Sequence, residues 1–505
     1  MNQKSATPRD ASAIILIRND EVLWAQRNPQ LKFLGGWHAF PGGKVESSDA
    51  EIDVKNCTDK DLGKFIVSAV RELFEEVGVL LVRNGEKLTK GQRASLHDEL
   101  ISGRNSFKEI LDHWNLWINA EDFLYTGFWT TPQFSPVRFK TRFFIAKCPE
   151  KQMPYAAISE MQDIEFITPK NALKRWGNSE VLIAPPVLIS LQVLAAEENL
   201  TTDEHGFTQI NAKPKNQILL ETSQKFDGNI DYIDLNSRIT VFPLRTETLP
   251  PATHTNCFIV GKKEFVVIDA ASKNATELAK LVELIDAMIE SGCVCREIIV
   301  SHLHPDHFGG ETVLQKHLKA KFGFEIPISA HKITAESLRG KVEFQKFVED
   351  EQLFELKDNF GELFKLKALL TPGHARGHLC FYDESKGFLL SSDNVVGAGT
   401  VLIAPPEGNM INYLNSLERM KNLPNLRFLC GSHGSAIYDA KAKIEEYILH
   451  RMTREKQIVE AINSGAKTPR EIVAKVYIGL DEKLVKLAEK SVEAHLEKLA
   501  SEAQA

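Results

Sequence analysis

The run H-x-H-x-D-H at residues 302–307 constrains this chain more than any other stretch. It directly follows the apolar residues 298–300, which are typical of the end of a buried strand. Residues two apart on an extended segment point the same way, so His302 and His304 can reach one metal ion. Imidazoles and a carboxylate, without a thiolate, suit zinc, or alternatively manganese or iron, in a site that keeps a position open for water.

The second half of the run points elsewhere. Pro305 and Asp306 are typical of a helix start, so we expect Asp306 and His307 at a strand-to-helix turn, where they can serve a second ion beside the first. The alternative is a set of surface or core histidines, which rarely produces so regular a spacing. The run therefore predicts a metal site with room for two ions.

A site for two ions needs more ligands than the run holds, and three later segments supply candidates. Each places a His or Asp directly after an apolar stretch, where loops can converge on one rim. The three candidates are His374 in T-P-G-H, Asp393 in L-L-S-S-D and His433 in C-G-S-H-G. Together with the run, these segments resemble the metallo-β-lactamase fold over residues 236–445.

That resemblance implies an αβ/βα sandwich with a dinuclear centre, which holds two zinc ions, or manganese or iron. The implied groups are His302, His304 and His374 around one ion, and Asp306, His307 and His433 around the other. Asp393 would bridge the two ions, and Asp306 would also take part in catalysis. Asp269 would support the run at residues 302–307, whereas His378 is expected to have a structural or substrate-contacting role.

An acidic helix marks the first third of the chain. Residues 62–77 have helical periodicity, and Gly78 is a natural stop. Glu72, Glu75 and Glu76 lie on one face at i, i+3 and i+4, where three carboxylates repel one another unless a hard cation such as magnesium sits among them. A solvated acidic helix face is the alternative interpretation.

The surroundings of this helix resemble the Nudix box. Gly43, Asp49 and R-E-L-F-E-E-V-G-V at residues 71–79 follow its order, although Asp49 replaces a Glu and residues 51–62 are inserted. The resemblance implies an α/β/α sandwich that cleaves a nucleoside diphosphate linked to another moiety. The implied ligands of magnesium, or manganese, are Glu75, Glu76 and the Gly43 carbonyl. Glu72 would be a further ligand or, alternatively, the base for the attacking water. Arg71 would orient the glutamates.

Further residues narrow the Nudix resemblance. A signature seen in coenzyme A diphosphatases of the family is matched in part, and the implied cofactor- or substrate-binding residues are Arg27, Lys32, Gly42 and Gly43. Residues 8–196 as a whole resemble the branch that contains mammalian Nudix type 19, including a helical insert at about residues 90–116. The implied substrate is a small-molecule diphosphate, with coenzyme A or its esters as the leading candidate.

The length of 505 residues is too great for one core and suggests about three domains. Residues 197–235 are polar and aperiodic, so we expect a linker there and domains at residues 8–196, 236–445 and 446–505. A hydrophobic content of 43% and a charged content of 26% are those of a soluble globular protein. The net charge of -7 argues against a general nucleic-acid binder, although a local basic groove stays open.

Cysteine usage and hydropathy indicate the compartment. Seven scattered cysteines without C-x-x-C spacing indicate reduced thiols in a cytosol-like environment. No apolar run approaches the length that spans a bilayer, and the polar N-terminal residues do not resemble a signal sequence. We therefore expect a soluble cytoplasmic protein without a membrane partner.

The C-terminal tail is predicted to be helical. Thr468, Pro469 and Glu471 fit the N-cap, N1 and N3 positions of a capping box that opens a helix through about Tyr477. Three short helices beginning near His450 resemble the winged-helix tail of the lactamase-like group that includes β-lactamase-like protein 2, an endoribonuclease. The near-balanced charge of this tail favours a packing or dimerisation element, and with it a homodimer, but leaves a grip on nucleic acid open.

These features predict a two-headed hydrolase of multidomain α/β architecture. Two divalent ions lower the pKa of a bridging water toward neutrality and polarise the oxygen under attack, so the second head is expected to hydrolyse a thioester or a phosphodiester. The first head would split a diphosphate, and acyl-coenzyme A would be the shared substrate. The alternative is an endoribonuclease in which the Nudix-like domain senses a nucleotide, with RNA the less favoured partner because the chain is acidic.

Overall fold

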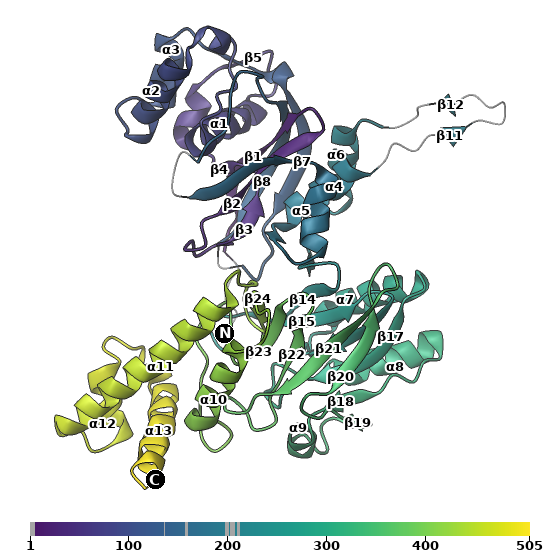
Figure 1. The fold of residues 1–505 in the computed structure, drawn as a ribbon, viewed down its shortest axis with the longest axis vertical. Helices are drawn as coiled ribbons and strands as arrows, with labels where there is room; N and C mark the ends of the chain where they lie inside the picture. The colour runs from purple at the N-terminus through teal and green to yellow at the C-terminus, as the bar shows by residue number, and fades with distance from the viewer. Residues whose placement is uncertain are drawn as a thin grey trace. The chain divides into compact units, whose positions relative to one another are not determined.

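The structure is a computed structural model that describes residues 6–135, 137–156, 160–196, 201–202, 208–209 and 213–504. The chain forms two compact units, residues 1–231 and residues 232–505, and each is described by itself (Figure 1). None of the helices in the described part of the chain combines the length and apolar character needed to cross a bilayer.

A mixed sheet forms the centre of the first unit. Its strands are β1 (Arg9–Arg18), β2 (Glu21–Arg27), β3 (Trp37–Ala39), β4 (Gly42–Lys44), β7 (Phe123–Thr130), β8 (Phe139–Lys147), β9 (Met161–Ile167) and β10 (Leu182–Ile183). The order is β10-β3-β2-β1-β8-β7, with β4 on β1 and β9 on β2. Strands β1 and β2 form a hairpin, since they pair in antiparallel register across the turn at Asn19, whose φ is 56°.

Helices cover both faces of this sheet because the strand residues alternate in direction. On β1, Ile14 and Leu16 pack against α1 (Lys60–Val77), and Ile15 packs in the opposite core with α5 (Pro185–Ala195). The predicted inner face of α1 is buried, and Gly78 ends the helix with φ 68°. The expected α/β/α sandwich is confirmed, with α4 (Pro169–Gly177) on the α5 side.

Smaller elements complete the first unit. The helical insert forms α2 (Lys90–Ile101) and α3 (Phe107–His113). Two small sheets each consist of one strand pair, β5 (Val54–Lys55) with β6 (Ile118–Asn119), and β11 (Thr201–Thr202) with β12 (Thr208–Gln209). Short 3-10 turns lie at Ser47–Glu51, Gly85–Lys87 and Ala120–Asp122.

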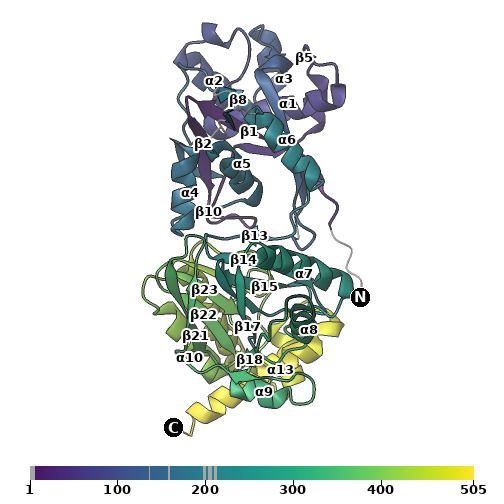
Figure 2. The ribbon, with the colours of Figure 1, turned by 90° about the vertical axis from the view of Figure 1, so that its right-hand side faces the viewer.

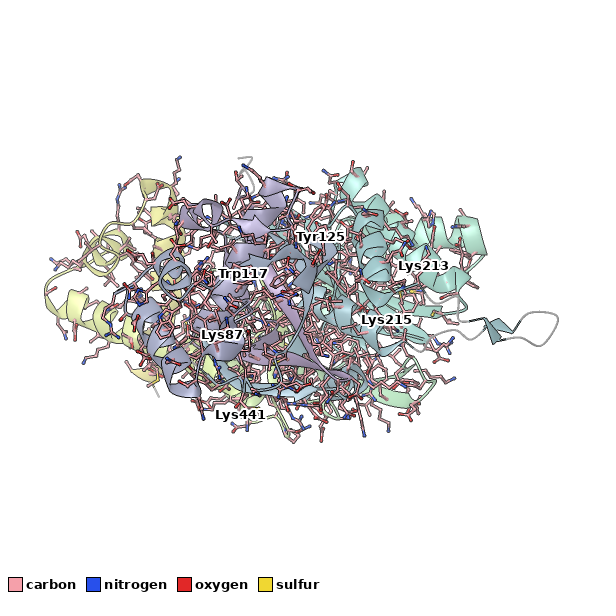
Figure 3. All side chains as sticks on the ribbon, turned by 90° about the horizontal axis from the view of Figure 1, so that it is seen from above. Lys87, Trp117, Tyr125, Lys213, Lys215 and Lys441 are labelled. Atoms are coloured by element: carbon pink, nitrogen blue, oxygen red, sulfur yellow. The ribbon has the colours of Figure 1, made fainter. Side chains whose placement is uncertain are left out.

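The expected linker contains a helix, α6 (Lys215–Lys225). Its Ser223 hydroxyl contacts the Phe128 backbone of β7. Lys215 at the start of α6, which Figure 3 labels, donates to the carbonyls of Val193 and Ala196 at the end of α5. Tertiary contacts thus order a stretch that has no periodicity of its own. Residues 197–200, 203–207 and 210–212 of the expected linker lie outside the described residues.

The second unit is built on strands that form one folded sheet. The strands are β13 (Ile233–Asp234), β14 (Ile239–Arg245), β15 (His254–Gly261), β16 (Glu264–Ile268), β17 (Val294–Val300), β18 (Ile328–Ala330), β19 (Lys346–Phe347), β20 (Leu353–Lys357), β21 (Leu363–Leu370), β22 (Leu379–Asp383), β23 (Phe388–Ser392) and β24 (Phe428–Gly431). Strands β16 and β20 pair only at Glu264 and Lys357, so the sheet folds into two halves there.

Each half of this sheet packs against its own helices (Figure 2). The helices on the first half are α7 (Ala275–Glu290) and α8 (Glu311–Phe322), with the short α9 (Lys332–Ser337) beside β18, and those on the second half are α10 (Met410–Lys421) and α11 (Ala440–Asn463). This arrangement is the expected αβ/βα sandwich. Loops at the ends of the strands carry the predicted ligands.

The tail begins differently from the prediction. We expected three short helices from near His450, but α11 starts at Ala440 and runs without a break to Asn463. Its first half packs in the core with α10 through Ile444, and its second half packs through Ile458 with α12 (Pro469–Val476) and α13 (Val485–Glu502). One helix therefore serves two cores. A 3-10 turn at Glu482–Leu484 precedes α13.

The capping box of α12 is confirmed, and it gives a test of the tail. The Thr468 hydroxyl accepts the Glu471 N–H at 3.2 Å, and the Glu471 carboxylate accepts the Thr468 N–H. We expect Thr468→Ala to cost about 1 kcal/mol and to speed amide exchange in α12 about fivefold. Thr468→Ser, which keeps the hydroxyl, should exchange as the wild type does; equal acceleration in both variants would contradict the assignment.

Candidate metal centres

The H-x-H-x-D-H run lies in the loop between β17 and α8. The expectation that Pro305 and Asp306 open the next helix is wrong, because α8 begins only at Glu311. Instead, the His307 N–H donates to the His304 carbonyl at 3.0 Å and closes a turn. This turn lies where Asp306 and His307 come close to His433.

The structure brings the predicted ligands together in two groups. Within each group the ligand atoms lie within 4.8 Å of one another: His302, His304, His374 and Asp393 form the first group, and Asp306, His307 and His433 form the second. They come from loops after β17, β21, β23 and β24. The seven residues are those implied by the metallo-β-lactamase resemblance, with Asp393 clustered in the first group.

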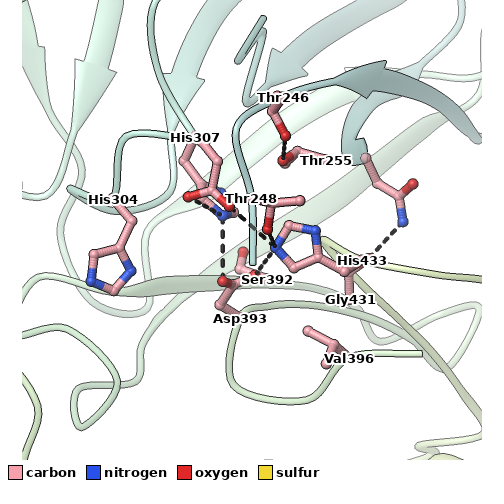
Figure 4. Close-up of polar contacts among 12 residues, drawn as sticks. Thr246, Thr248, Thr255, His304, His307, Ser392, Asp393, Val396, Gly431 and His433 are labelled. Atoms are coloured by element: carbon pink, nitrogen blue, oxygen red, sulfur yellow. Dashed lines mark hydrogen bonds and ion pairs between the residues drawn. The ribbon is translucent and has the colours of Figure 1, made fainter. Parts of the chain in front are cut away.

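Asp393 lies between the groups. Its Oδ2 is 3.4 Å from His307 Nε2 and 3.6 Å from His374 Nε2, and its Oδ1 is 3.4 Å from His433 Nε2. Figure 4 shows His307 and His433 directed at this carboxylate, with Thr248 beside the His433 ring. Ligand atoms about 2.1 Å from a tetrahedral ion lie about 3.4 Å apart, so this spacing suits an ion between them.

The nitrogen that faces away from the centre is anchored in three of these histidines. His307 Nδ1 lies 2.8 Å from Asp269, His374 Nδ1 lies 2.9 Å from the Leu402 carbonyl, and His433 Nδ1 lies 2.9 Å from the His254 carbonyl. In the neutral form of each ring, these acceptors fix the tautomer with the proton on Nδ1, so Nε2 presents its lone pair to the centre. Asp269 thus supports His307, which belongs to the run at residues 302–307.

Buried atoms at the centre test whether a metal fits. Among the described residues, His307 Nε2, His374 Nε2 and Asp393 Oδ1 are buried without a hydrogen-bond partner. Leaving such atoms unpaired costs free energy, and a divalent ion in each of the two groups would satisfy them. The donor set of imidazoles and carboxylates suits zinc or a similar divalent ion.

Burial keeps the first group's imidazoles neutral. It lowers the pKa of His374 to about 3 and that of His302 well below its usual value. Burial also opposes the charged form of His307, but the carboxylates of Asp393 and Asp269 outweigh it and raise the pKa of that ring. Neutral imidazoles are the form that binds metal, so the first group is ready to accept an ion.

Two buried residues near the centre fix the backbone of candidate ligands and are not ligands themselves. His378 Nε2 accepts the Asp393 N–H at 3.1 Å, which favours the structural role over substrate contact. Asn256, which the sequence analysis missed, donates through Nδ2 to the carbonyls of Gly431 and Gly434 and so fixes the loop of His433. Its only sequence signal is a polar residue inside an apolar strand.

The second candidate centre lies on α1 of the first unit. Arg71 forms a bidentate ion pair with the buried Asp49 at 2.9 and 3.0 Å. The same guanidinium donates to Glu72 at 2.9 Å and to Glu75 at 3.1 Å. Asp49 therefore performs a positioning role despite replacing a Glu, and the insertion after it does not prevent this contact.

The carboxylates of α1 are not a solvated face. Glu76 is only 3% exposed and accepts the Gly42 N–H at 2.9 Å. A Cβ at Gly43 would lie 2.4–2.6 Å from the Glu72 carboxylate, so a side chain at residue 43 would displace this carboxylate from its present position. Burial raises the pKa of Glu72 to about 7 and that of Glu76 well above its usual value, so a cation would be favourable at this surface.

The candidate ligand atoms of this acidic centre are not gathered as closely as those of the His and Asp groups. Among the described residues, only the groups in the second unit bring three ligand atoms within 4.8 Å of one another. Arg27 lies close enough to lower the pKa of Glu76, although burial and Glu72 outweigh it. Lys32 is exposed in the loop after β2, and no ion pair in the described part of the chain joins it to these carboxylates.

Family models match three parts of the chain. The Metallo-beta-lactamase superfamily matches residues 250–433, the NUDT19 Nudix domain matches residues 53–194, and the Beta-lactamase associated winged helix domain matches residues 468–505. Both enzymatic families generally bind divalent metals, in agreement with the clusters described above.

Three relatives show where the similarity lies. The Beta-lactamase-like protein 2 homolog of Caenorhabditis elegans is 28% identical over 44% of this chain and 70% of its own length. The Putative nudix hydrolase 7 of the same organism is 28% identical over 50% of this chain and 88% of its own length. An Atrochrysone carboxyl ACP thioesterase of Pseudocercospora fijiensis is 27% identical over 49% of this chain and 70% of its own length.

Both candidate centres therefore lie in domains that belong to hydrolase families. The chain is a hydrolase that joins a Nudix domain of the NUDT19 type to a metallo-beta-lactamase domain with its associated winged helix.

Proposed function

We propose that this protein hydrolyses acyl-coenzyme A at two separate centres, the thioester in the second unit and the diphosphate in the first. The observation that carries the proposal is the pair of His and Asp groups whose buried Nε2 atoms face one carboxylate. Seven free cysteines, most of them buried, support a reducing environment, and we place the protein in the cytoplasm.

The second unit is proposed to cleave the thioester. Two zinc ions held by the two groups would supply hydroxide at neutral pH and polarise the carbonyl oxygen. Asp393 would bind between both groups, and the anchored rings of His307, His374 and His433 would keep their Nε2 atoms aimed at it. Addition of water across the C–S bond gives a carboxylic acid and free coenzyme A. Similarity to a protein named as a thioesterase supports this choice of bond.

The first unit is proposed to cleave the diphosphate. Magnesium bound by Glu72, Glu75 and Glu76 would neutralise charge on the phosphate oxygens. Glu72, whose pKa is about 7 without a cation, is suited to take a proton from the attacking water. Water adds to one phosphorus and the bridging P–O bond breaks, which yields a 4′-phosphopantetheine and 3′-phosphoadenosine 5′-phosphate.

A first prediction concerns the ligands in the second unit. We expect His304→Ala to remove one of two zinc equivalents and to lower thioester hydrolysis at least about 100-fold, because an ion that polarises the carbonyl is lost. Zinc content by elemental analysis and release of free thiol check this. His317→Ala, which changes a partly exposed histidine paired with Asp286 outside both groups, is the matched control. Unchanged thiol release in His304→Ala would refute the assignment.

A second prediction separates the two heads. Glu76→Gln keeps an oxygen for the Gly42 N–H but removes the charge that would bind magnesium, so diphosphate cleavage should fall about 100-fold or more. Thiol release should stay at the wild-type level. Products are resolved by chromatography, and Glu86→Gln on an exposed turn serves as the control. Loss of both activities in Glu76→Gln would contradict independent centres.

A third prediction concerns the class of substrate. We expect the wild type to release free thiol and 4′-phosphopantetheine products from acyl-coenzyme A and to leave single-stranded RNA intact. The formal charge of -7 gives no general attraction to polyphosphates. Cleavage of RNA that disappears in His304→Ala, without turnover of acyl-coenzyme A, would favour the endoribonuclease alternative and exclude the proposed substrate.

A further inference from the structure

The loop at residues 393–409 holds parts of the metal centre in the second unit. It begins with Asp393, the carboxylate between the two ligand groups. Further along, the Leu402 carbonyl accepts the hydrogen bond from His374 Nδ1 at 2.9 Å. The position of this loop therefore determines where one ligand carboxylate lies and how one ligand imidazole is turned.

Two buried tyrosines fasten the first part of the loop. Tyr447 of α11 contacts both the carbonyl and the N–H of Val396 through its hydroxyl, at 3.1 and 3.3 Å. Tyr413 of α10 donates its hydroxyl proton to the Asn394 carbonyl at 2.7 Å. Both contacts are to backbone atoms, so they fix the path of the chain directly after Asp393.

Arg451 of α11 fastens the second part of the loop. Its guanidinium donates from Nη2 to the carbonyl of Val401, the residue before Leu402, and lies 5.3 Å from the centre of the Tyr413 ring. The arginine is only 4% exposed, and its Nε has no hydrogen-bond partner among the described residues. No carboxylate in the described part of the chain forms an ion pair with it.

A buried guanidinium without a carboxylate partner is costly, and an apolar side chain of similar length could fill the same space at lower cost. The guanidinium must therefore provide something that packing alone does not. What it provides here is a charged hydrogen bond to the backbone of the metal loop, one residue from the carbonyl that orients His374.

The C-terminal helix α13 supports α11 beside this arginine. Glu455, one turn beyond Arg451, contacts His495 Nδ1 at 3.1 Å and Lys498 at 2.8 Å, both on α13. Ala494 of α13 packs into the same core as Val401. The tail is thus joined to the metal loop through α11.

We propose that Arg451 is a positioning residue through which the C-terminal tail sets the ion site formed by His302, His304 and His374. Without its hydrogen bond, the Leu402 carbonyl would move and His374 would lose its fixed tautomer and orientation. The second group would be affected less, because His307 and His433 are anchored by Asp269 and by the His254 carbonyl. This inference rests on the proposed metal-dependent function of the second unit.

The test is zinc affinity of the full chain, measured by competition with a chromophoric chelator. We expect Arg451→Met to weaken one of the two zinc sites about 10- to 100-fold and to leave the other within about twofold, because lost support of a ligand has effects of that size. Arg451→Lys, which retains a donor, should fall between Arg451→Met and the wild type. Thiol release should follow occupancy of the weakened site.

The matched control is Arg454→Met on the same helix. Arg454 also donates to a backbone carbonyl, that of Val476 at 3.2 Å, and also lies over a tyrosine ring, that of Tyr477 at 4.1 Å, but both belong to the tail. The Arg454→Met variant should bind zinc at both sites with the affinities of the wild type. Equal weakening of both sites in Arg451→Met and Arg451→Lys, or wild-type affinities in both, would overturn the inference. A wild type without zinc would instead refute the proposed function.

Discussion

The buried carboxylate of Asp269 is the contact on which the metal-binding half of the protein depends. It accepts the Ser301 N–H and the Ser301 hydroxyl proton, each at 2.7 Å, and faces His307 Nδ1 at 2.8 Å. A carboxylate in the core is tolerated only when its oxygens are paired, and here the pairing joins the end of β16 to the loop after β17. The same contact positions the run and selects the tautomer of one ligand, so folding and metal binding use one interaction.

The elements with strong periodicity could be predicted from sequence, and those fixed by tertiary contacts could not. Helix α1 and the capping box of α12 follow from local patterns that the structure reproduces. Helix α6 was missed because its order depends on Ser223 packing against β7. Similarly, α11 extends across an expected boundary because its two halves are buried in different cores.

The candidate ligands were predictable because His and Asp residues that directly follow apolar strands form a recognisable metal-binding pattern. Their supports were not, since the acceptors for His374 and His433 are the backbone carbonyls of Leu402 and His254. Any residue type can supply a carbonyl, so the sequence does not reveal which one it is. Arg451 was missed for a related reason, because its partner is backbone and its distance in sequence from the ligand is large.

The two centres differ in how far they are arranged before an ion binds. In the second unit, anchored imidazoles leave unpaired nitrogens aimed at one point, so ion binding requires little rearrangement. In the first unit, Arg71 occupies the carboxylates of Glu72 and Glu75, while Glu76 is held by the Gly42 N–H.

A cation entering the first unit must therefore compete with a guanidinium already in place. Burial raises the pKa of Glu72 to about 7, so near neutral pH without a cation this carboxyl is partly protonated. The contacts of Arg71 with Glu72 and Glu75 are short, but its bidentate pair with buried Asp49 would persist if those contacts opened. Asp49 thus allows Arg71 to release the carboxylates of Glu72 and Glu75 without itself becoming an unpaired buried charge, which makes the substitution of Asp for Glu compatible with cation binding here.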